Sequence, residues 1–336
     1  MADFISRRPI WSIVIAIAVA LLLALVFAVW SPGMEAVLGR KRVFLSALFN
    51  GVTLGALYFL VASGFTLIFG LMRNVNLAHG SLYLFGGYVG YSAGALTGSW
   101  LVALLVAFLA AAIVGVLMQV LLFRWMEGED LRQTLVTIGL SIIFADLLLW
   151  SYGGDTFQVT TPDWLSGPVQ LPFVVALRSN GEAVMMTYPL VRIAILVGAV
   201  ATGVLMWLAL NRTRVGMLVR AGVDDRDMLA ATGVRVQLIF ILIFAFGAGL
   251  AGVAGVVGGT FQSLQPGEDS KILLSSLVVV IVGGMGSIPG AAMGALIVGL
   301  AEQFGSVYMP TYAVMLTFII MVAVLTVRPQ GLAARR

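Results

Sequence analysis

The sequence contains no cysteine and only one histidine, His79. The absence of cysteine excludes disulfides, thiolate metal sites and cysteine nucleophiles. A lone histidine without nearby carboxylates is a poor metal site, and it lacks the partner that acid–base catalysis needs. We therefore expect no catalytic residue, no metal site and no cofactor in this chain.

Charge is scarce as well. Only 10% of the 336 residues are charged, 61% are hydrophobic, and the mean hydropathy is +1.07. A soluble domain has about 25% charged residues, and membrane β-barrels alternate apolar and polar positions. The long apolar runs therefore predict an all-α, polytopic membrane protein in contact with the lipid bilayer. The net charge of +4 does not indicate a nucleic-acid partner, because the basic residues form no clustered face.

A phosphate-binding loop is missing. Such a loop needs a Gly-Lys pair, and neither lysine of the chain, Lys41 or Lys271, follows a glycine. The chain cannot hydrolyse ATP by that route. Gly247, Gly249 and Gly252 match the dinucleotide-binding spacing, but they lie inside an apolar run without the strand that this motif requires.

Ten apolar runs are candidates for membrane segments. They cover residues 10–30, 43–71, 81–98, 99–123, 133–151, 190–210, 238–260, 272–284, 290–304 and 311–327. With the N-terminus inside, ten segments return the C-terminus to the same side, and 13 of the 19 basic residues then fall in inner loops. Cytoplasmic loops collect Lys and Arg, so the charge distribution favours cytoplasmic termini.

The first run, residues 10–30, can be interpreted as a signal peptide or as a retained span. It is longer than the roughly 7 to 15 residues of a signal-peptide core, and no clear cleavage site follows, which favours a retained span. The basic cluster at residues 40–42 lies outside in this topology. That disagreement with the charge rule indicates that the first span is an addition to an older core.

Three further segments have distinct patterns. Residues 272–284 are too short for a comfortable crossing, and we expect the adjoining Gly- and Pro-containing stretch 283–290 to be irregular, as in a re-entrant element. Residues 152–189 form a polar outer segment suited to contact an external partner. Residues 211–237 form an inner loop whose mixture of charged and small residues predicts a short amphipathic helix along the membrane surface.

Small residues recur every four positions in two of the runs. These residues are Gly86, Gly90, Gly94 and Gly98, and then Gly247, Ala251, Gly255 and Gly259. Spacing of four places them on one face of a helix, where neighbouring backbones can approach closely. Tight helix packing is the favoured interpretation, and a surface along which helices slide is compatible with it.

Ionisable residues inside the runs are few, and each is costly unless it is paired or hydrated. Glu302 is interpreted either as a structural hydrogen-bonding group or as part of a transport pathway. Asp146 lies close to the outer end of its run, where interfacial solvation is the leading interpretation. His79, among the polar residues Asn74 and Asn76, indicates a break between two membrane helices.

Four motifs resemble those of one family, the branched-chain amino-acid type of ABC importer permease. They are Asn-Leu-Ala-His-Gly at 76–80, Gly-Gly-Met-Gly-Ser-Ile-Pro-Gly at 283–290, Asn-Gly-Val-Thr-Leu-Gly-Ala at 50–56, and Arg-Pro-Gln-Gly-Leu at 328–332. The resemblance runs from about residue 43 to residue 332. It implies a permease domain over 43–332, preceded by an extra span and basic linker at 1–42 and followed by a basic tail at 333–336.

The resemblance also implies partners and sites. A permease of this family works with a second homologous permease, two cytoplasmic ATPase subunits and an external solute-binding protein, in the bacterial inner membrane. The inner loop 211–237 resembles the coupling segment that docks on the ATPase, with Arg220, Ala221, Asp224, Asp225, Ala230, Ala231 and Gly233. The expected pathway or break residues are Asn74, Asn76, His79, Gly284, Gly286, Ser287 and Glu302.

The leading hypothesis is therefore an importer subunit without enzymatic activity, which takes up a branched-chain amino acid or a related small solute. The alternative is a self-sufficient secondary transporter or channel for a small polar solute, which should contain a relay of Asp, Glu or His within its spans. Only Asp146 and Glu302 qualify for such a relay. No residue distinguishes among the substrates that the resemblance allows.

Overall fold

The protein is described by a computed structural model that covers residues 41–72, 75–126, 128–177, 183–224 and 226–333. The predicted span at 10–30, most of the linker before residue 43, and Asn74, Asp225 and residues 334–336 lie outside this part of the chain.

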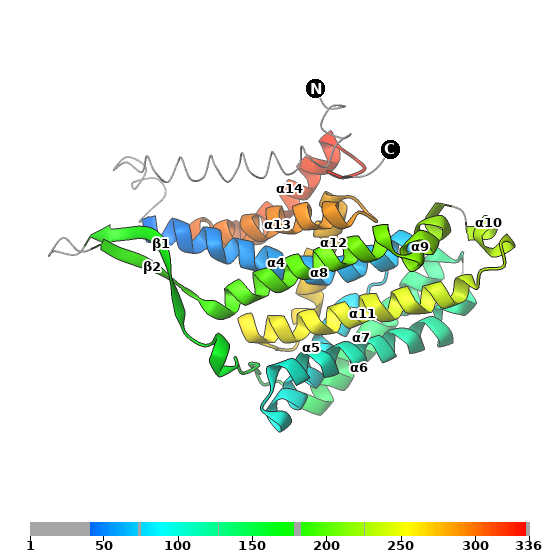
Figure 1. The fold of residues 1–336 in the computed structure, drawn as a ribbon, viewed down its shortest axis with the longest axis horizontal. Coiled ribbons are helices and arrows are strands. Elements are labelled where there is room, and N and C mark those ends of the chain that lie inside the picture. Colours follow the sequence, from blue (N-terminus) through cyan, green and yellow to red (C-terminus); the bar gives the residue numbers. More distant parts are fainter. Residues whose placement is uncertain (1–40, 73–74, 127, 178–182, 225, 334–336) are drawn as a thin grey trace.

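The described residues form a helical bundle with one β-hairpin (Figure 1). Its α-helices are α4 (Lys41–Met72), α5 (His79–Thr97), α6 (Trp100–Leu121), α7 (Asp130–Tyr152), α8 (Leu190–Arg212), α9 (Arg214–Asp224), α10 (Arg226–Ala231), α11 (Val236–Phe261), α12 (Glu268–Gly283), α13 (Ile288–Tyr308) and α14 (Ala313–Val327). Short 3₁₀ turns are η1 (Phe123–Met126), η2 (Asp163–Leu165) and η3 (Pro310–Tyr312), and the strands are β1 (Pro168–Leu177) and β2 (Ala183–Pro189).

The helical class expected from composition is confirmed. Seven stretches of the described residues are long and apolar enough to cross a membrane: α4, α6, α7, α8, α11, α13 and the η3–α14 unit. The chain is therefore a multi-pass membrane protein. Helices α5 and α12 do not meet the same criteria. The count of ten segments and the placement of both termini in the cytoplasm stay predictions.

Within this mostly helical chain the structure also contains one β-hairpin, which the sequence pattern did not predict. Strands β1 and β2 pair antiparallel, with register shifts between Leu171 and Val174 and between Val174 and Ala176. This stretch contains β-branched and aromatic residues, which suit a pleated, half-exposed ribbon. The hairpin lies at one end of the bundle, and α9 and α10 lie at the opposite end (Figure 1).

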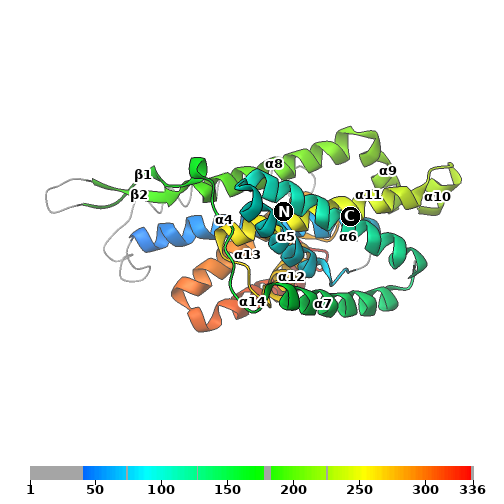
Figure 2. The same cartoon turned by 90° about the horizontal axis from the view of Figure 1, so that it is seen from below.

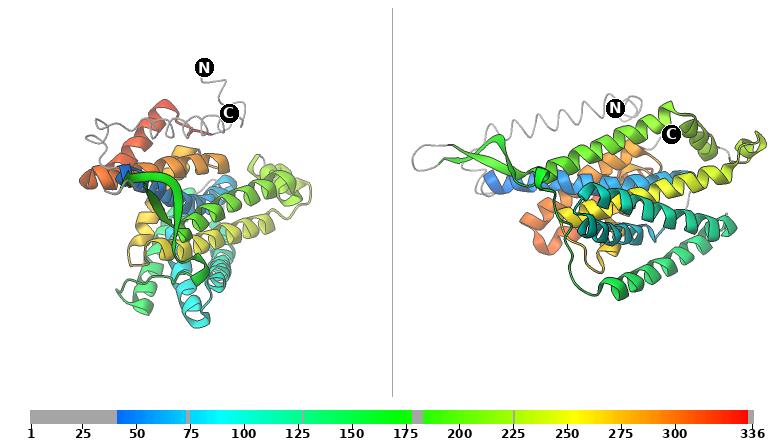
Figure 3. Two further views of the ribbon diagram at one scale, coloured as in Figure 1. Left: turned by 60° about the vertical axis from the view of Figure 1, so that its left-hand side comes forward. Right: turned by 60° about the horizontal axis from the view of Figure 1, so that its bottom comes forward.

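Helices α4 and α11 form the centre of the bundle and are mostly buried. α4 packs along α13 and α11, and α11 also packs along α5 and α6. Figure 2 shows α7 and α14 on one side of the bundle and α8 on the other, and Figure 3 shows the same separation from two further directions. These outer helices bury little of their surface within the chain.

The small residues spaced by four do mediate tight packing, as predicted. A Cβ added at Gly86 would lie 2.2 Å from Gly252 Cα, and one added at Gly255 would lie 2.0 Å from the Tyr83 carbonyl oxygen. The backbones of α5 and α11 thus touch directly, which only glycine permits. Gly98, the last of the first series, instead ends α5 in the left-handed conformation with φ +67°.

The irregular stretch predicted at 283–290 is shorter than expected. Gly283 is the last residue of α12, and residues 288–290 form the first turn of α13. Proline is tolerated in the first turn because its missing N–H would have no intrahelical partner there. The Ser287 side chain caps this helix by accepting a hydrogen bond from the Gly290 N–H at 3.1 Å. The break is therefore confined to residues 284–287.

Candidate functional site

The chain reverses direction between α4 and α5, at the polar break predicted around residues 74–79. The Asn76 side chain is buried, and its Oδ1 accepts a hydrogen bond from the Ala78 N–H at 3.1 Å. The Leu77 N–H donates to Thr137 Oγ1 of α7 at 3.2 Å. Side chains therefore satisfy backbone groups that a non-helical segment leaves without partners inside a bundle.

His79 fixes the depth at which α5 begins. Its side chain is fully buried, its Nε2 lies 3.1 Å from the Val61 carbonyl oxygen, and its ring stands edge-on to Phe65. Val61 lies eleven residues before the end of α4, a distance of about 16 Å along the helix axis. Helix α5 therefore starts in the interior of the bundle and runs toward the hairpin end. The structure supports a structural role for His79.

A second helix starts at the same depth. The first turn of α12 touches the first turn of α5, because a Cβ added at Gly80 would lie 2.2 Å from the Asp269 carbonyl oxygen. The Asp269 side chain is 6% exposed, and Ser81 Oγ donates a hydrogen bond to its Oδ2 at 3.5 Å. A carboxylate at the N-terminal turns of two helices is stabilised by their partial positive charge.

The same turn of α12 also carries two more charged residues. Lys271 Nζ lies 3.7 Å from Glu268 Oε2, and the Lys271 side chain is 49% exposed. A charge that is half exposed at this depth is not stable against lipid hydrocarbon. This part of α12 therefore faces water or another protein chain.

Glu302 of α13 accepts a hydrogen bond from the Tyr58 hydroxyl of α4 at 2.6 Å. Tyr58 is 1% exposed, so the bond ties α4 to α13 within the bundle. The structure thus shows the structural hydrogen bond proposed for Glu302, while a role in transport stays a prediction. Asp146, the other acidic candidate, is exposed on α7.

Gly284, Gly286 and Ser287 form the turn between α12 and α13. Gly284 and Gly286 have φ of +104° and +79°, a conformation that favours glycine. This turn lies beside the last turns of α4, because Gly286 approaches Gly70. The C-terminal segment folds under it, with the Leu332 N–H donating to the Val282 carbonyl at 2.9 Å. The turn is therefore at the α9–α10 end, not in the middle of the bundle.

The predicted coupling segment folds into two short helices, α9 and α10, where the sequence suggested one. Its apolar residues Val219 and Leu229 are buried against Ile239, Phe240 and Ile243 of α11, which holds both helices to the bundle. Arg220 donates to the Leu210 carbonyl of α8. The chain turns at Gly233, with φ +82°, before α11 begins.

The remaining surface of α9 and α10 is open. Ala230, Ala231, Met217 and Met228 are exposed, and Ala221 is half-buried. The side chain of Asp224 lies outside the described part of the structure. A surface of this kind, small and apolar residues beside exposed arginines, is typical of a protein interface.

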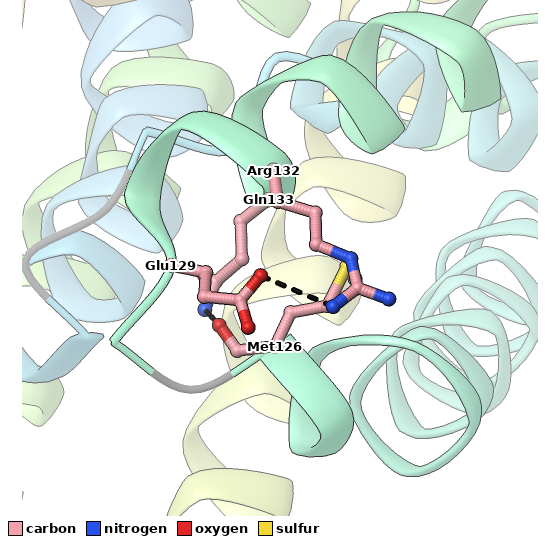
Figure 4. Close-up of polar contacts among 4 residues, drawn as sticks. All are labelled: Met126, Glu129, Arg132 and Gln133. Carbon is pink, nitrogen blue, oxygen red and sulfur yellow. Dashed lines mark hydrogen bonds and ion pairs between the residues drawn. The ribbon is translucent and has the colours of Figure 1, made fainter.

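A tight turn between α6 and α7 lies at the same end of the bundle. Arg132 forms an ion pair with Glu129 at 3.1 Å, and the Gln133 side chain donates to the Met126 carbonyl (Figure 4). Gln133 and Thr137 also line a small cavity with Asn76, which connects this turn to the break before α5.

The hairpin end is anchored by aromatic and polar contacts. The Tyr188 hydroxyl lies 2.8 Å from Thr53 Oγ1 and donates to the Phe49 carbonyl at 2.9 Å. The Arg192 guanidinium donates to the Asn50 side chain and lies 4.8 Å from the ring centre of Phe261. The base of the hairpin is therefore fixed to α4.

Comparison with known proteins gives the family. The model of the family described as "Branched-chain amino acid transport system / permease component" matches residues 47–325. The chain belongs to this permease family. The permease is 31% identical over 304 residues to the high-affinity branched-chain amino acid transport system permease protein BraD of Pseudomonas aeruginosa, with 87% of this chain and 96% of BraD covered.

Two further relatives have similar coverage. The permease is 31% identical to the high-affinity branched-chain amino acid transport system permease protein LivH of Escherichia coli K12, over 87% of this chain and 96% of LivH. It is 26% identical to a probable branched-chain amino acid transport permease protein LivH of Methanocaldococcus jannaschii, over 88% and 93%. No solved structure matches the permease significantly.

The structure of the permease brings some predicted residues together and separates others. Asn76 and His79 lie in the interior break, whereas Gly284, Gly286 and Ser287 lie at the α9–α10 end. Helix α12 packs against both α5 and α13, the helices that follow these two breaks.

Sequence reasoning missed the charged turn of α12. Pro266 and Gly267, followed by the two acidic residues Glu268 and Asp269, are a helix-start signal that could have located it. Among the described residues, no group of three or more His, Cys, Asp or Glu side chains could hold a metal ion.

Proposed function

We propose that the chain is one permease subunit of an ATP-driven importer in the bacterial inner (cytoplasmic) membrane, with a branched-chain or related hydrophobic amino acid as its substrate. The observation that carries this proposal is the exposed α9–α10 surface at the end of the bundle opposite the hairpin. A chain without a phosphate-binding loop needs an external source of energy, and this surface can receive it from two cytoplasmic ATPase subunits.

The contacts of α9 explain how force would reach the membrane segments. Arg220 holds α9 to the last turn of α8, and Val219 and Leu229 pack on the first turns of α11. A displacement of α9 and α10 by the ATPase subunits would therefore move α8 and α11 together, as a rigid-body transition requires.

The charged first turn of α12 supports a position for the transport pathway. The Lys271 side chain is half-exposed, and α7 and α14, which Figure 2 shows on one side of the bundle, bury little of their surface. We place the second permease against this side, so that the pathway runs between the two subunits past the first turns of α5 and α12. The solute-binding protein would deliver substrate at the hairpin end.

The test is uptake of radiolabelled leucine into liposomes that contain this chain, its second permease and the ATPase subunits, with the binding protein outside and ATP inside. We expect uptake that requires both ATP and the binding protein. Uptake by the permeases alone, driven by an ion gradient, would instead establish a self-sufficient secondary transporter. Competition by unlabelled isoleucine, valine, phenylalanine and urea then identifies the substrate class.

A further inference from the structure

An apolar groove of about 410 Å³ runs along the side of the bundle formed by α4, α8 and α13. On α8 it is lined by residues spaced by three and four, which therefore occupy one face of the helix: Leu196, Ala199, Val200, Gly203, Val204 and Trp207. No charged residue is among its lining residues. Such an apolar groove between transmembrane helices has the chemistry to receive one more helix.

Small residues form part of the lining of the groove. Gly55 and Ala56 of α4, Ala199 of α8 and Ala292 of α13 line it, and small residues let a further helix approach closely. At its rim, Val200 and Val204 of α8 are 59% and 52% exposed. The face is thus shaped for helix contact but is not covered by any described residue.

We propose that residues 10–30 of this chain occupy the groove as a transmembrane helix. These 21 residues contain no charged side chain, and as a helix they would be about 31 Å long. Ala16, Ala20, Ala24 and Ala28 recur every four positions, so that one face of this helix consists of small residues. That face is complementary to the small residues in the lining of the groove.

The covalent connection to α4 favours residues 10–30, rather than a separate chain, as the helix in the groove. Helix α4 begins at Lys41 at the hairpin end and forms one wall of the groove (Figure 1). The ten residues 31–40 reach at most about 36 Å, so the end of the span must lie within that distance of the start of α4. A tethered helix is present at a high effective concentration, so it competes well against lipid and against other subunits.

The proposed helix also has a mechanical consequence. Helix α8 buries little of its surface in the described bundle, yet it leads directly into α9. A helix seated between α8, α4 and α13 would hold α8 against the centre of the bundle. The N-terminal span would thereby stiffen the connection between α9 and the membrane segments.

The absence of native cysteine makes cross-linking a direct test. Both Trp30 and Leu190 lie at the hairpin end in this arrangement, so Ala20 and Val200, ten residues further along each helix, meet at the same depth. We expect the A20C/V200C variant to form a disulfide with copper phenanthroline in native membranes. The matched control is A18C/V200C, because Ala18 is rotated by about 200° from Ala20 on a helix. A second pair, A24C/L196C, tests the register one turn closer to the hairpin end.

A protease site inserted within residues 31–40 makes the cross-link visible, because the cut fragments stay together only when they are joined. The proposal requires a several-fold higher yield for A20C/V200C than for A18C/V200C, with wild-type gel-filtration profiles for both. Equal yields, or no cross-link for either pair, would place lipid in the groove and overturn it. A disulfide-linked dimer of V200C alone would also overturn it, in favour of a second copy of the chain.

Discussion

Gly255 lies where α11 and α5 touch backbone to backbone, and its position allows a sharp prediction. In the Gly255→Ala variant the new Cβ would lie 2.0 Å from the Tyr83 carbonyl oxygen, which belongs to a backbone that cannot move aside locally. Forcing α5 away from α11 should destabilise the folded protein by about 1 to 3 kcal/mol, the usual cost of overpacking. Thermal unfolding of the protein in detergent measures the effect.

Gly198→Ala is the matched control for Gly255→Ala. Gly198 is also helical, but its added Cβ meets no atom within 4 Å. Alanine is the better helix former by about 0.5 to 1 kcal/mol, so this variant should be as stable as the natural protein or slightly more stable. Equal destabilisation by both substitutions would contradict the assignment of Gly255 to a close helix contact.

Asp269 gives a second prediction for a single residue. Its carboxylate is buried at the first turns of α5 and α12, where the two helix N-termini stabilise a negative charge. We expect Asp269→Asn to lower the free energy of unfolding by about 1 to 2 kcal/mol. Asp163→Asn, at an exposed acidic residue in the 3₁₀ turn η2, should leave stability unchanged. Indistinguishable melting of the two variants would mean that the Asp269 charge contributes nothing.

Helix α10 leads into α11 through a turn at Gly233. Its φ of +82° costs a residue with a Cβ about 1 to 2 kcal/mol. We expect Gly233→Ala to change the path from α10 into α11 and to uncouple transport from ATP hydrolysis, while the membrane fold stays intact. The measurement is substrate-stimulated ATPase activity of the assembled transporter, together with uptake.

Gly128 provides the control for this element. It lies in the turn before α7 at the same end of the bundle, has φ +80°, and would meet no atom within 4 Å if a Cβ were added. Gly128→Ala therefore introduces the same backbone strain away from α9 and α10. Loss of coupling in Gly233→Ala but not in Gly128→Ala supports the proposal, whereas full coupling in both would exclude α9–α10 as the contact with the ATPase.

The elements differ in how far the sequence predicts them. Long apolar runs locate the membrane helices, because burial in lipid imposes a nearly uniform composition on them. The depth within the bundle at which a helix begins cannot be predicted from the residues near its start. Helix α5 begins inside the bundle because His79 contacts Val61, 18 positions earlier, and α12 begins beside Gly80 through a contact across almost 190 positions.

The hairpin illustrates a different limit. Its strands are partly exposed and interrupted by polar residues and prolines, so the sequence favours an extended segment, and only the observed pairing of β1 with β2 identifies it as a hairpin. The coupling segment, α9 and α10, can be predicted in part. Its amphipathic pattern predicts a surface helix, but the point at which α9 gives way to α10 depends on the packing of Val219 and Leu229 against α11.

At the scale of the whole molecule, the two weakly buried sides of the bundle have different chemistry. The side formed by α4, α8 and α13 has a groove without charged lining residues. The opposite side, with α7, α12 and α14, exposes Lys271 of α12 and Asp146 of α7. Because exposed charge is unfavourable in hydrocarbon, lipid or a further apolar helix suits the first side, and water or a second permease suits the other.

This difference can be measured with two matched leucines. Leu274, one turn after Lys271 on α12, is 51% exposed, and Leu205 on α8 is 65% exposed. We expect a charged, membrane-impermeant thiol reagent to label Leu274→Cys in the assembled transporter at least tenfold faster than Leu205→Cys, because thiolate forms in water and not in lipid. Substrate together with its binding protein should slow the labelling of Leu274→Cys. Equally slow labelling of both cysteines would place lipid against α12, and the pathway would then have to lie elsewhere in the molecule.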